Sequence, residues 1–395
     1  MKGLRNFIDK IKPNFEKGGK FEKLHSTFDA FETFLFVPNH VTRSGSHIRD
    51  SIDLKRVMIV VVVALMPALL FGMYNTGLQH FRAIGAGDVP FWTCFWFGLL
   101  KVLPIIIVSY VVGLGIEFIS AQIRHHEVNE GFLVSGMLIP LVMPVDVPLW
   151  MVAVATAFAV IIGKEVFGGY GSYPFNPAAV GYAVAAVSWP EQVFRYPQPY
   201  TSIPLWDASM VPVSSTIEDT LRSGGMLNIR ALVLSLGEYA APMGTGAALV
   251  ILACGLFLWT QKDAHMSASV SFLLTCALIA FLFPRQAGLA DSAVLANVLP
   301  RLRCVRDELL TGAILFSAVF LLNEPYTCVH HRMGRILYGV LVGAITMGFR
   351  YYGVYETGVC FALLTVNSIS GWMDRTESRL YQLMHRPAAG KEGAE

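Results

Sequence analysis

The chain has 395 residues, of which 54% are hydrophobic and only 15% are charged. This apolar share exceeds what the core of a water-soluble protein of the same length uses, so composition excludes an ordinary soluble enzyme and indicates a membrane protein. The formal net charge of +2 carries little information by itself, and we expect no nucleic-acid partner.

The segment before the first apolar run, residues 1–56, is strongly basic. Its cationic residues are Lys2, Arg5, Lys10, Lys12, Lys17, Lys20, Lys23, Arg43, Arg49, Lys55 and Arg56. Because cytoplasmic segments carry an excess of lysine and arginine, we expect this end in the cytoplasm. The first long apolar run begins at Val57, so we expect no signal peptide.

Apolar windows predict an all-α integral membrane protein with about ten transmembrane helices. The windows lie near residues 57–74, 97–119, 131–143, 149–162, 177–189, 244–259, 268–283, 309–322, 336–349 and 358–372. Several, including 131–143 and 358–372, are too short to cross alone. Either their boundaries extend by several residues or they are half-helices.

The longest polar interruption divides the chain into two halves of five spans each. The halves are residues 57–189 and 244–374, joined by an outer-side loop at 190–243 and followed by a cytoplasmic tail at 375–395. Residues 135–138 resemble 311–314, and residues 170–173 resemble 352–355. Since an odd number of spans inverts the second copy, we predict two inverted five-helix repeats.

One loop conflicts with the charge rule. Residues 284–308 would lie outside, yet they carry Arg285, Arg301, Arg303 and Arg306. Either the number of spans changes near this loop or the loop binds an acidic partner.

No set of cysteines and histidines has metal-ligand spacing, so we expect no metal site. The six cysteines are scattered without a C-x-x-C pair, and the paired histidines at 125–126 and 330–331 lie in predicted cytoplasmic loops. We expect Lys101, inside an apolar stretch, to extend to the outer interface beside Trp92 and Trp96.

Four stretches carry a recognisable pattern: FEKGGK at 15–20, RDSIDLKR at 49–56, EVNEGF at 127–132 and KEVFGG at 164–169. Together they resemble the B subunits of sodium-translocating NADH:quinone oxidoreductases, and the similarity covers nearly the whole chain. FNPA at 175–178 and NEP at 323–325 also match the related D subunits of Rnf complexes. The long basic N-terminus favours the B subunits.

The resemblance implies one subunit of a six-subunit enzyme in the bacterial inner membrane. Ten spans from a cytoplasmic start would place both termini in the cytoplasm. That complex passes electrons from NADH to quinone and moves sodium outward, and this chain is not catalytic alone. NADH would bind to another subunit. The sequence agrees, because GGYG at 168–171 is not a G-x-G-x-x-G turn within a βαβ unit.

In the family, the B subunit carries FMN joined through its phosphate to a threonine, in a motif like D-G-x-S-G-A-T on the outer side. The best match is Thr216, whose neighbours Ser214 and Ser215 could donate hydrogen bonds to the phosphate. Val213 and Met210 depart from the motif that a flavin transferase would read. Covalent FMN and an unmodified Ser/Thr turn are therefore both open. The resemblance also allows riboflavin shared with partner subunits.

The resemblance places quinone beside the basic N-terminal segment, near Gly131 and Phe132. A quinone site needs an apolar slot with room for a ring. Gly131 would leave that room, and Phe132 could stack on the ring. The alternative is a glycine that serves only helix packing.

Three carboxylates in family-like segments lie at or near span ends: Glu130, Glu324 and Asp374. Carboxylates at membrane depth are costly and usually face a partner or a pathway, and sodium prefers oxygen ligands. We expect an ion pathway at these residues, with interfacial ion pairs as the alternative. The sequence does not choose between sodium and protons.

Three other functions remain open. An Rnf-type ion-pumping subunit, or a channel or transporter of five-plus-five inverted-repeat type without a redox cofactor, would share the architecture. A structural relative could keep the fold and partners but lack the flavin anchor. The basic N-terminus and the EVNEGF segment favour the oxidoreductase.

Overall fold

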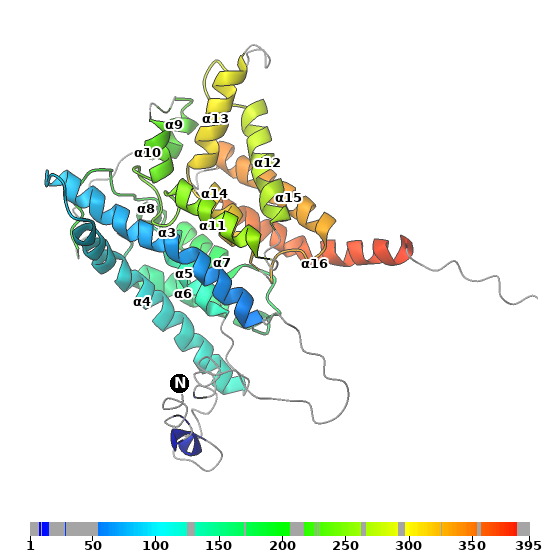
Figure 1. The fold of residues 1–395 in the computed structure, drawn as a ribbon. Helices are drawn as coiled ribbons and strands as arrows, with labels where there is room; N and C mark the ends of the chain where they lie inside the picture. The colour runs from blue at the N-terminus through cyan, green and yellow to red at the C-terminus, as the bar shows by residue number, and fades with distance from the viewer. Residues whose placement is uncertain are drawn as a thin grey trace, which may run out of the picture.

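The computed structural model describes residues 8, 10–15, 28, 54–124, 131–169, 171–205, 217–225, 227, 229–261, 266–290, 297–324, 326–353 and 357–384. Within these ranges the chain forms helices and no strand (Figure 1). The all-α prediction is therefore confirmed for the described residues.

The two longest helices, α3 (Leu54–Ala83) and α4 (Phe91–Arg124), lie side by side as a hairpin (Figure 1). Their outward residues are large and apolar, as on a surface that faces lipid; Val111 and Ile119 of α4 are more than 60% exposed. Among the described residues, three stretches are long and apolar enough to cross a membrane, namely Val57–Ala83, Phe91–Arg124 and Leu149–Phe167.

Shorter helices complete the first half and the connection to the second. They are α5 (Phe132–Leu141), α6 (Leu149–Ile161), the 3-10 helix η3 (Glu165–Phe167), α7 (Pro177–Ser188), α8 (Pro190–Val193), α9 (Ile217–Arg222) and α10 (Ala231–Leu236). A further 3-10 helix, η1 (Lys12–Asn14), lies near the N-terminus.

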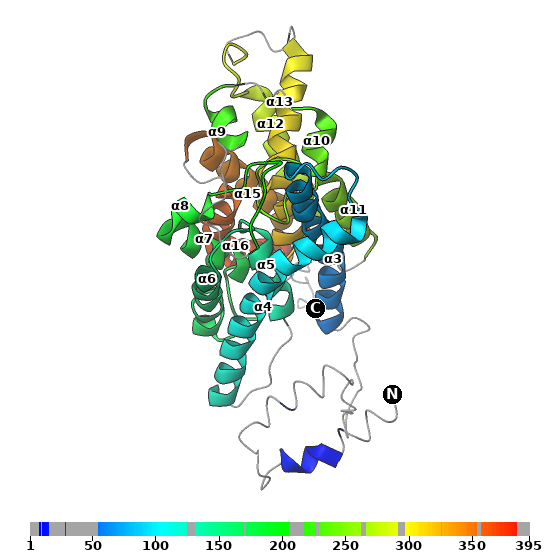
Figure 2. The same ribbon diagram turned by 90° about the vertical axis from the view of Figure 1, so that its left-hand side faces the viewer.

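The second half begins with α11 (Ala248–Thr260) and α12 (Ser267–Leu282). It continues with α13 (Val298–Leu310), α14 (Ile314–Phe316), the π-helix η5 (Ser317–Leu321), α15 (Arg332–Tyr352) and α16 (Gly358–Met384). Figures 1 and 2 place α13 at one end of the molecule and the last turns of α4 toward the other.

Two of the predicted spans differ from single transmembrane helices. The window at 131–143 contains α5, whose 10 residues rise only about 15 Å, half of the hydrocarbon thickness. The window at 309–322 is not one helix: α13 ends at Leu310, Gly312 takes a φ of 64°, and the chain resumes as α14 and η5. The predicted span is therefore an interrupted segment rather than one continuous helix, because glycine allows a left-handed residue that interrupts the helix.

The surplus of arginines at 284–308 has an explanation inside the chain. Arg285 is buried against two glutamates, and Arg301 donates to the carbonyl oxygens of Phe281 at 2.8 Å and Leu282 at 3.0 Å. These two carbonyls end α12, where no helical N–H reaches them. Two of the four arginines therefore serve packing rather than an acidic partner.

Lys101 does not extend to an interface. Its side chain is buried, its Nζ lies 2.6 Å from Oδ1 of Asp146, and it donates to the carbonyl oxygen of Pro204 at 2.8 Å. The expectation that it reaches water is wrong, because a carboxylate inside the protein supplies the counter-charge.

The α3–α4 contact depends on two glycines that let the backbones touch. A Cβ added to Gly98 would overlap the backbone of Met73, and one added to Gly77 would overlap that of Cys94. Small residues at helix interfaces are how membrane helices reach close packing.

We predict that Gly98→Val lowers the free energy of unfolding by about 1–3 kcal/mol, because the new side chain forces α3 and α4 apart. This effect is measured as the thermal midpoint in detergent, which the loss of the folded peak in size-exclusion chromatography reports. Gly115→Val on the same helix is the matched control, since no atom lies within 4 Å of its added Cβ. Equal midpoints for the two variants would contradict the prediction.

Candidate functional site

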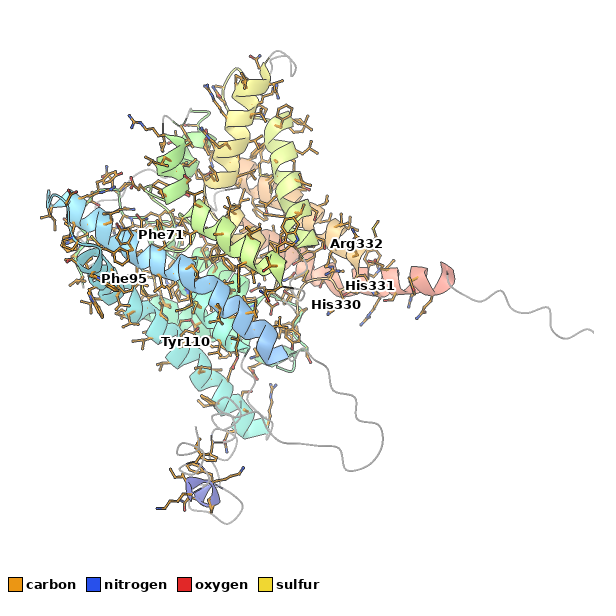
Figure 3. The ribbon with its side chains drawn as sticks, in the orientation of Figure 1. Phe71, Phe95, Tyr110, His330, His331 and Arg332 are labelled. Atoms are coloured by element: carbon orange, nitrogen blue, oxygen red, sulfur yellow. The ribbon has the colours of Figure 1, made fainter. Side chains whose placement is uncertain are left out.

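Buried charged side chains gather at the two opposite ends of α15. This helix has 21 residues and is therefore about 30 Å long. Arg350 lies in its last turn. Glu324 precedes the first turn of α15 in the sequence. His330, His331 and Arg332 lie at that end of the helix (Figure 3).

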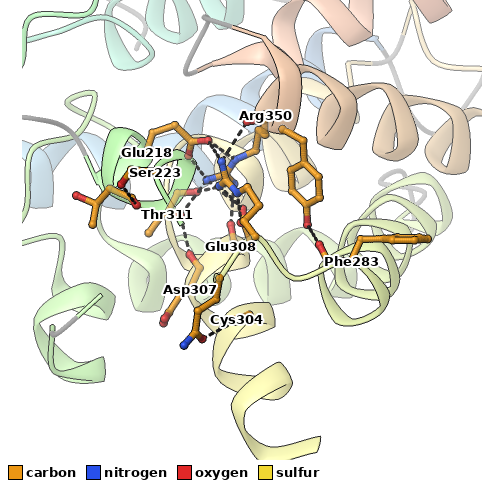
Figure 4. Close-up of polar contacts among 12 residues, drawn as sticks. Glu218, Ser223, Phe283, Cys304, Asp307, Glu308, Thr311 and Arg350 are labelled. Atoms are coloured by element: carbon orange, nitrogen blue, oxygen red, sulfur yellow. Dashed lines mark hydrogen bonds and ion pairs between the residues drawn. The ribbon is translucent and has the colours of Figure 1, made fainter. Parts of the chain in front are cut away.

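The first group, named here the arginine cluster, consists of Glu218, Arg285, Glu308 and Arg350; Figure 4 shows Glu218, Glu308 and Arg350 converging. Arg285 donates to both carboxylate oxygens of Glu308, at 2.6 and 2.8 Å, and to Glu218 at 2.7 Å. Arg350 donates to the other oxygen of Glu218 at 2.5 Å. Two cations face two anions, so the buried cluster is neutral, as a low-dielectric interior requires.

Arg350 also stabilises the interruption after α13. Its Nη1 donates to the carbonyl oxygen of Glu308 at 2.8 Å, and its Nη2 donates to Oγ1 of Thr311 at 3.0 Å. The last carbonyls of a helix lack intrahelical partners, and a guanidinium supplies several donors in a fixed plane. The side chain therefore ties α9, α13 and α15 together.

Glu218 is held in its ionised form. Burial alone would raise the pKa of this carboxyl, but Arg350 and Arg285 outweigh burial and lower the pKa from 4.5 to about 2. A carboxylate with two guanidinium partners is strongly biased toward the charged state.

A cleft of about 500 Å³ opens beside the arginine cluster. Leu221 of α9 and residues of α13 line it, together with the loop before α13. The complete lining is Leu221, Gly225, Leu227, Arg285, Gln286, Pro300, Arg303, Cys304, Arg306, Asp307 and Glu308. The cleft combines apolar walls with three guanidinium groups and two carboxyl groups; Arg306 pairs with Asp307 and Arg285 with Glu308, which leaves Arg303 as the surplus cation of the lining.

The candidate flavin anchor falls on residues that the structure does not describe. Thr216, Ser214 and Ser215 lie outside the described residues, and α9 begins at the next residue of the sequence, Ile217. Covalent FMN at Thr216 therefore stays a prediction.

The second group, named here the lysine cluster, consists of Glu117, Lys164, Glu165, Tyr173 and Glu324. Lys164 follows α6, and its Nζ donates to Oε1 of Glu117 on α4; both side chains are buried. Glu165 accepts a hydrogen bond from the hydroxyl of Ser120 of α4, and it also forms an ion pair with Arg124 of the same helix. The end of α4 is therefore fastened to the segment after α6 by two ion pairs.

Glu324 is buried and accepts three hydrogen bonds. Tyr173 donates its hydroxyl to Oε1 at 2.5 Å, while the backbone N–H and hydroxyl of Thr327 donate to Oε2 at 3.1 and 2.6 Å. These donors give both oxygens of the carboxyl a partner, as a buried polar group requires. Tyr173 belongs to the first half and Glu324 to the second, so this bond joins the two halves.

The family-like asparagines hold the chain at the same place. Asn176 accepts a hydrogen bond from the N–H of Ala178 at 2.9 Å and thereby caps α7, while its amide donates to the carbonyl oxygen of Leu321 at 3.1 Å. Asn323 donates to the carbonyl oxygen of Val319 and to Ser269, both at 2.8 Å. Asn176 caps α7, and Asn323 donates to a carbonyl oxygen of the π-helix η5. These two roles explain why amide side chains occur at these positions.

The other predicted ion residues lie apart from these bonds. Asp374 of α16 accepts a hydrogen bond from the N–H of His330 at 3.0 Å, and its second oxygen lies 3.1 Å from the Nδ1 of that histidine. Glu130 lies outside the described residues. Their place in an ion pathway stays a prediction.

The predicted quinone residues lie at the start of α5. Phe132 is only 1% exposed, and its ring meets that of Tyr110 edge-on at a centroid distance of 6.2 Å. The ring also fills the space over Gly113, where any side chain would collide with it. Phe132 therefore packs α5 against α4, and a contact with quinone stays a prediction.

Sequence reasoning missed both clusters as units. Lys164 and Arg350 each lie just after a predicted apolar span, and a long cationic side chain at such a position is expected to extend to water. A usable signal was the presence of Glu218, Arg285 and Glu308 in segments predicted on the same side of the membrane, because opposite charges in one compartment are able to pair.

We predict that the arginine cluster makes stability fall on acidification between about pH 4.5 and pH 2. The folded pKa of Glu218 is lowered, so in this window the unfolded chain binds a proton that the folded chain does not, and folding weakens as pH falls. Glu218→Gln removes this contribution, which unfolding midpoints across that pH range measure. Thr220→Ala on the same helix is the matched control; it changes no titratable group and keeps the wild-type profile. An unchanged profile in Glu218→Gln would contradict the assignment.

Comparisons with known proteins show the family of this chain. Residues 41–382 match the model of the NQR2, RnfD, RnfE family. The B subunit of the Na(+)-translocating NADH-quinone reductase of Pseudomonas aeruginosa (strain LESB58) is 34% identical over 94% of this chain and 96% of its own length. The B subunits of the same name from Chromohalobacter salexigens and Azotobacter vinelandii are 32% and 33% identical, over 98% and 94% of this chain and 97% and 96% of their own lengths. The chain therefore belongs to the NQR2, RnfD, RnfE family.

Proposed function

We propose that this chain is the flavin-carrying membrane subunit of a sodium-pumping NADH:quinone oxidoreductase. The observation that carries the proposal is the 34% identity, over 94% of the chain, to a relative named for that reaction. As one subunit, the chain is not catalytic alone. Its proposed partners are the NADH-oxidising and other membrane subunits of a six-subunit complex, a flavin transferase and quinone.

For the architecture, we propose ten spans in two inverted repeats, at 57–189 and 244–374, in a bacterial inner membrane. The element order supports this: α3, α4, α5, α6 and α7 parallel α11, α12, the α13–η5 segment, α15 and α16. In each half, two helices precede a short or broken helix, and two more follow it. The segments 1–56 and 375–395 would then be cytoplasmic, and the loop at 190–243 would face the outer compartment.

For the cofactor, we propose FMN joined through its phosphate to Thr216. Support comes from the cleft of about 500 Å³ beside α9, which has apolar walls and the guanidinium groups of Arg303 and Arg306. This volume and lining fit a flavin, and flavin supplies one- and two-electron transfer when bound. The arginine cluster holds α9 in place at the edge of this cleft.

Thr216→Ala is predicted to abolish flavin fluorescence of the denatured, gel-separated chain when it is expressed with its partner subunits and flavin transferase. Only a covalently held flavin survives denaturation, and the variant lacks the acceptor oxygen. Thr220→Ala, four residues later on α9, is the matched control and keeps the fluorescence. A dark wild-type band would instead favour a relative without the flavin anchor, for which Val213 and Met210 argue.

For the quinone, we propose a slot beside Gly131 and Phe132, near the cytoplasmic N-terminal segment. Phe132 packs edge-on against Tyr110 and is 1% exposed, so in this proposal it supports the corner at which the quinone ring binds. Gly131 precedes the first residue of α5 and offers no side chain there.

Gly131→Leu is predicted to raise the KM for quinone about tenfold, the effect of roughly 1.4 kcal/mol of lost binding. NADH oxidation by an artificial acceptor should stay at the wild-type rate, since that step does not need the slot. Both rates are measured on the purified complex. An unchanged quinone KM and unchanged inhibitor sensitivity would remove the quinone from this corner.

For the ion, we propose a sodium pathway that uses the carboxylates of Glu130, Glu324 and Asp374. Glu324 gives the strongest support, because it is a buried carboxylate at the contact between the halves and beside the end of a π-helix. Transporters of inverted-repeat type place ion sites at such junctions, beside interrupted helices.

A further inference from the structure

Helix α16 has two different faces where it packs against the start of α15. On its inner face, Asp374 accepts a hydrogen bond from the N–H of His330 at 3.0 Å, and Oγ of Ser378 lies 2.9 Å from Nε2 of His331. Residues four apart share one side of a helix, so these two contacts fix that side against α15.

The opposite face of α16 carries a tryptophan followed by two arginines. Trp372, Arg375 and Arg379 are spaced by three and four residues, so they lie on one side of the helix. All three side chains are exposed, and Trp372 is 68% exposed. Among the described residues, neither guanidinium group has a hydrogen bond or an ion pair. Figure 1 shows the last turns of α16 extending beyond the neighbouring helices.

A third exposed arginine comes from the start of α15. Arg332 is the first residue of that helix and follows His331, whose ring contacts Ser378. Arg379 follows Ser378 in the same way, so the two arginines belong to segments in direct contact. Figure 3 shows Arg332 beside α16.

The exposed apolar surface of both helices ends next to these arginines. On α15, Met333 and Leu337 are 69% and 50% exposed, and on α16 Ile369 is 41% exposed. Exposed apolar side chains of a membrane protein face acyl chains, and tryptophan prefers the interface between acyl chains and water. The arginines therefore lie where lipid headgroups are expected, with Trp372 at the boundary.

The charge of this region is not balanced by its own carboxylates. The segments 330–335 and 372–379 contain four arginines and two carboxylates, which leaves two positive charges when the histidines are neutral. Asp374 is bound by His330, and Glu377 accepts a hydrogen bond from the N–H of Gly334 at 2.7 Å. A guanidinium group pairs well with phosphate, because its planar donors match two phosphate oxygens.

We propose that Arg332, Trp372, Arg375 and Arg379 form a binding surface for the headgroup of an anionic phospholipid. The guanidinium groups bind the phosphate, and Trp372 lies at the level where the acyl chains begin. Arginines next to the end of a membrane helix attract acidic lipids in this way. This role goes beyond the proposed electron and ion steps and depends only on the chain spanning a membrane.

The experiment labels the purified complex in detergent with a photoreactive phosphatidylglycerol, or with phosphatidylcholine that carries the same photoreactive acyl chain. Peptide mass spectrometry then measures labelling of the α16 peptide that contains Trp372. Labelling near Val111 of α4, which is exposed and apolar, serves as the internal reference. In the wild type, half-maximal labelling of α16 is expected at a lower concentration of phosphatidylglycerol than of phosphatidylcholine.

The variants test whether the arginines cause this preference. Arg375→Gln and Arg379→Gln are each expected to raise the half-maximal phosphatidylglycerol concentration about fivefold, equivalent to roughly 1 kcal/mol per charge. The double variant Arg375→Lys with Arg379→Lys keeps the charges and most of the preference. Arg230→Gln is the matched control, because it removes one exposed arginine outside these two segments and leaves the labelling unchanged.

Loss of the preference in the glutamine variants, with retention in the lysine variant and the control, supports the proposal. Equal labelling of α16 by the two lipids in the wild type overturns it, as does a preference that persists when both arginines are glutamine. An α16 peptide that neither lipid labels also overturns it and favours an acidic segment of a partner subunit on this surface.

Discussion

Charges buried among apolar helices must be neutralised where they lie, and in this protein that constraint fixes how the segments outside the long helices are placed. The arginine cluster meets it with two guanidinium groups and two carboxylates, contributed by α9, the loop after α12, α13 and α15. Removal of any one charge would leave its partner buried in a low-dielectric site without a counter-charge. The cluster therefore joins α9 to the helical bundle.

The lysine cluster obeys the same constraint in a different way. Glu165 pairs with Arg124, Lys164 pairs with Glu117, and Glu324 accepts hydrogen bonds from neutral donors. The arginine cluster balances two guanidinium groups with two carboxylates and suits a rigid support. The lysine cluster instead fastens α4 to the segment after α6 and joins Tyr173 to Glu324.

Composition and hydropathy were sufficient to predict an all-helical membrane protein, because long apolar runs such as Phe91–Arg124 have few alternatives. Family-like segments were also sufficient for the family, which the comparisons confirm. Hydropathy did not predict the interruption at Gly312, because the end of α13 and the buried η5 form one continuous apolar window in the sequence. The ion pairs were hidden as well: Lys101 with Asp146 and Arg350 with Glu218 join residues distant in the chain, and no local pattern indicates such pairs. The anchor Thr216 and Glu130 lie outside the described residues, so the sequence remains their basis.

The central claim is that this chain belongs to a complex that moves sodium when NADH reduces quinone. Its most direct test is uptake of radioactive sodium into proteoliposomes that contain the purified complex, after addition of NADH and quinone and in the presence of a protonophore. We expect uptake that the protonophore leaves intact or increases, because primary sodium movement does not need a proton gradient. Uptake that the protonophore abolishes, or NADH oxidation without any sodium movement, would contradict the account.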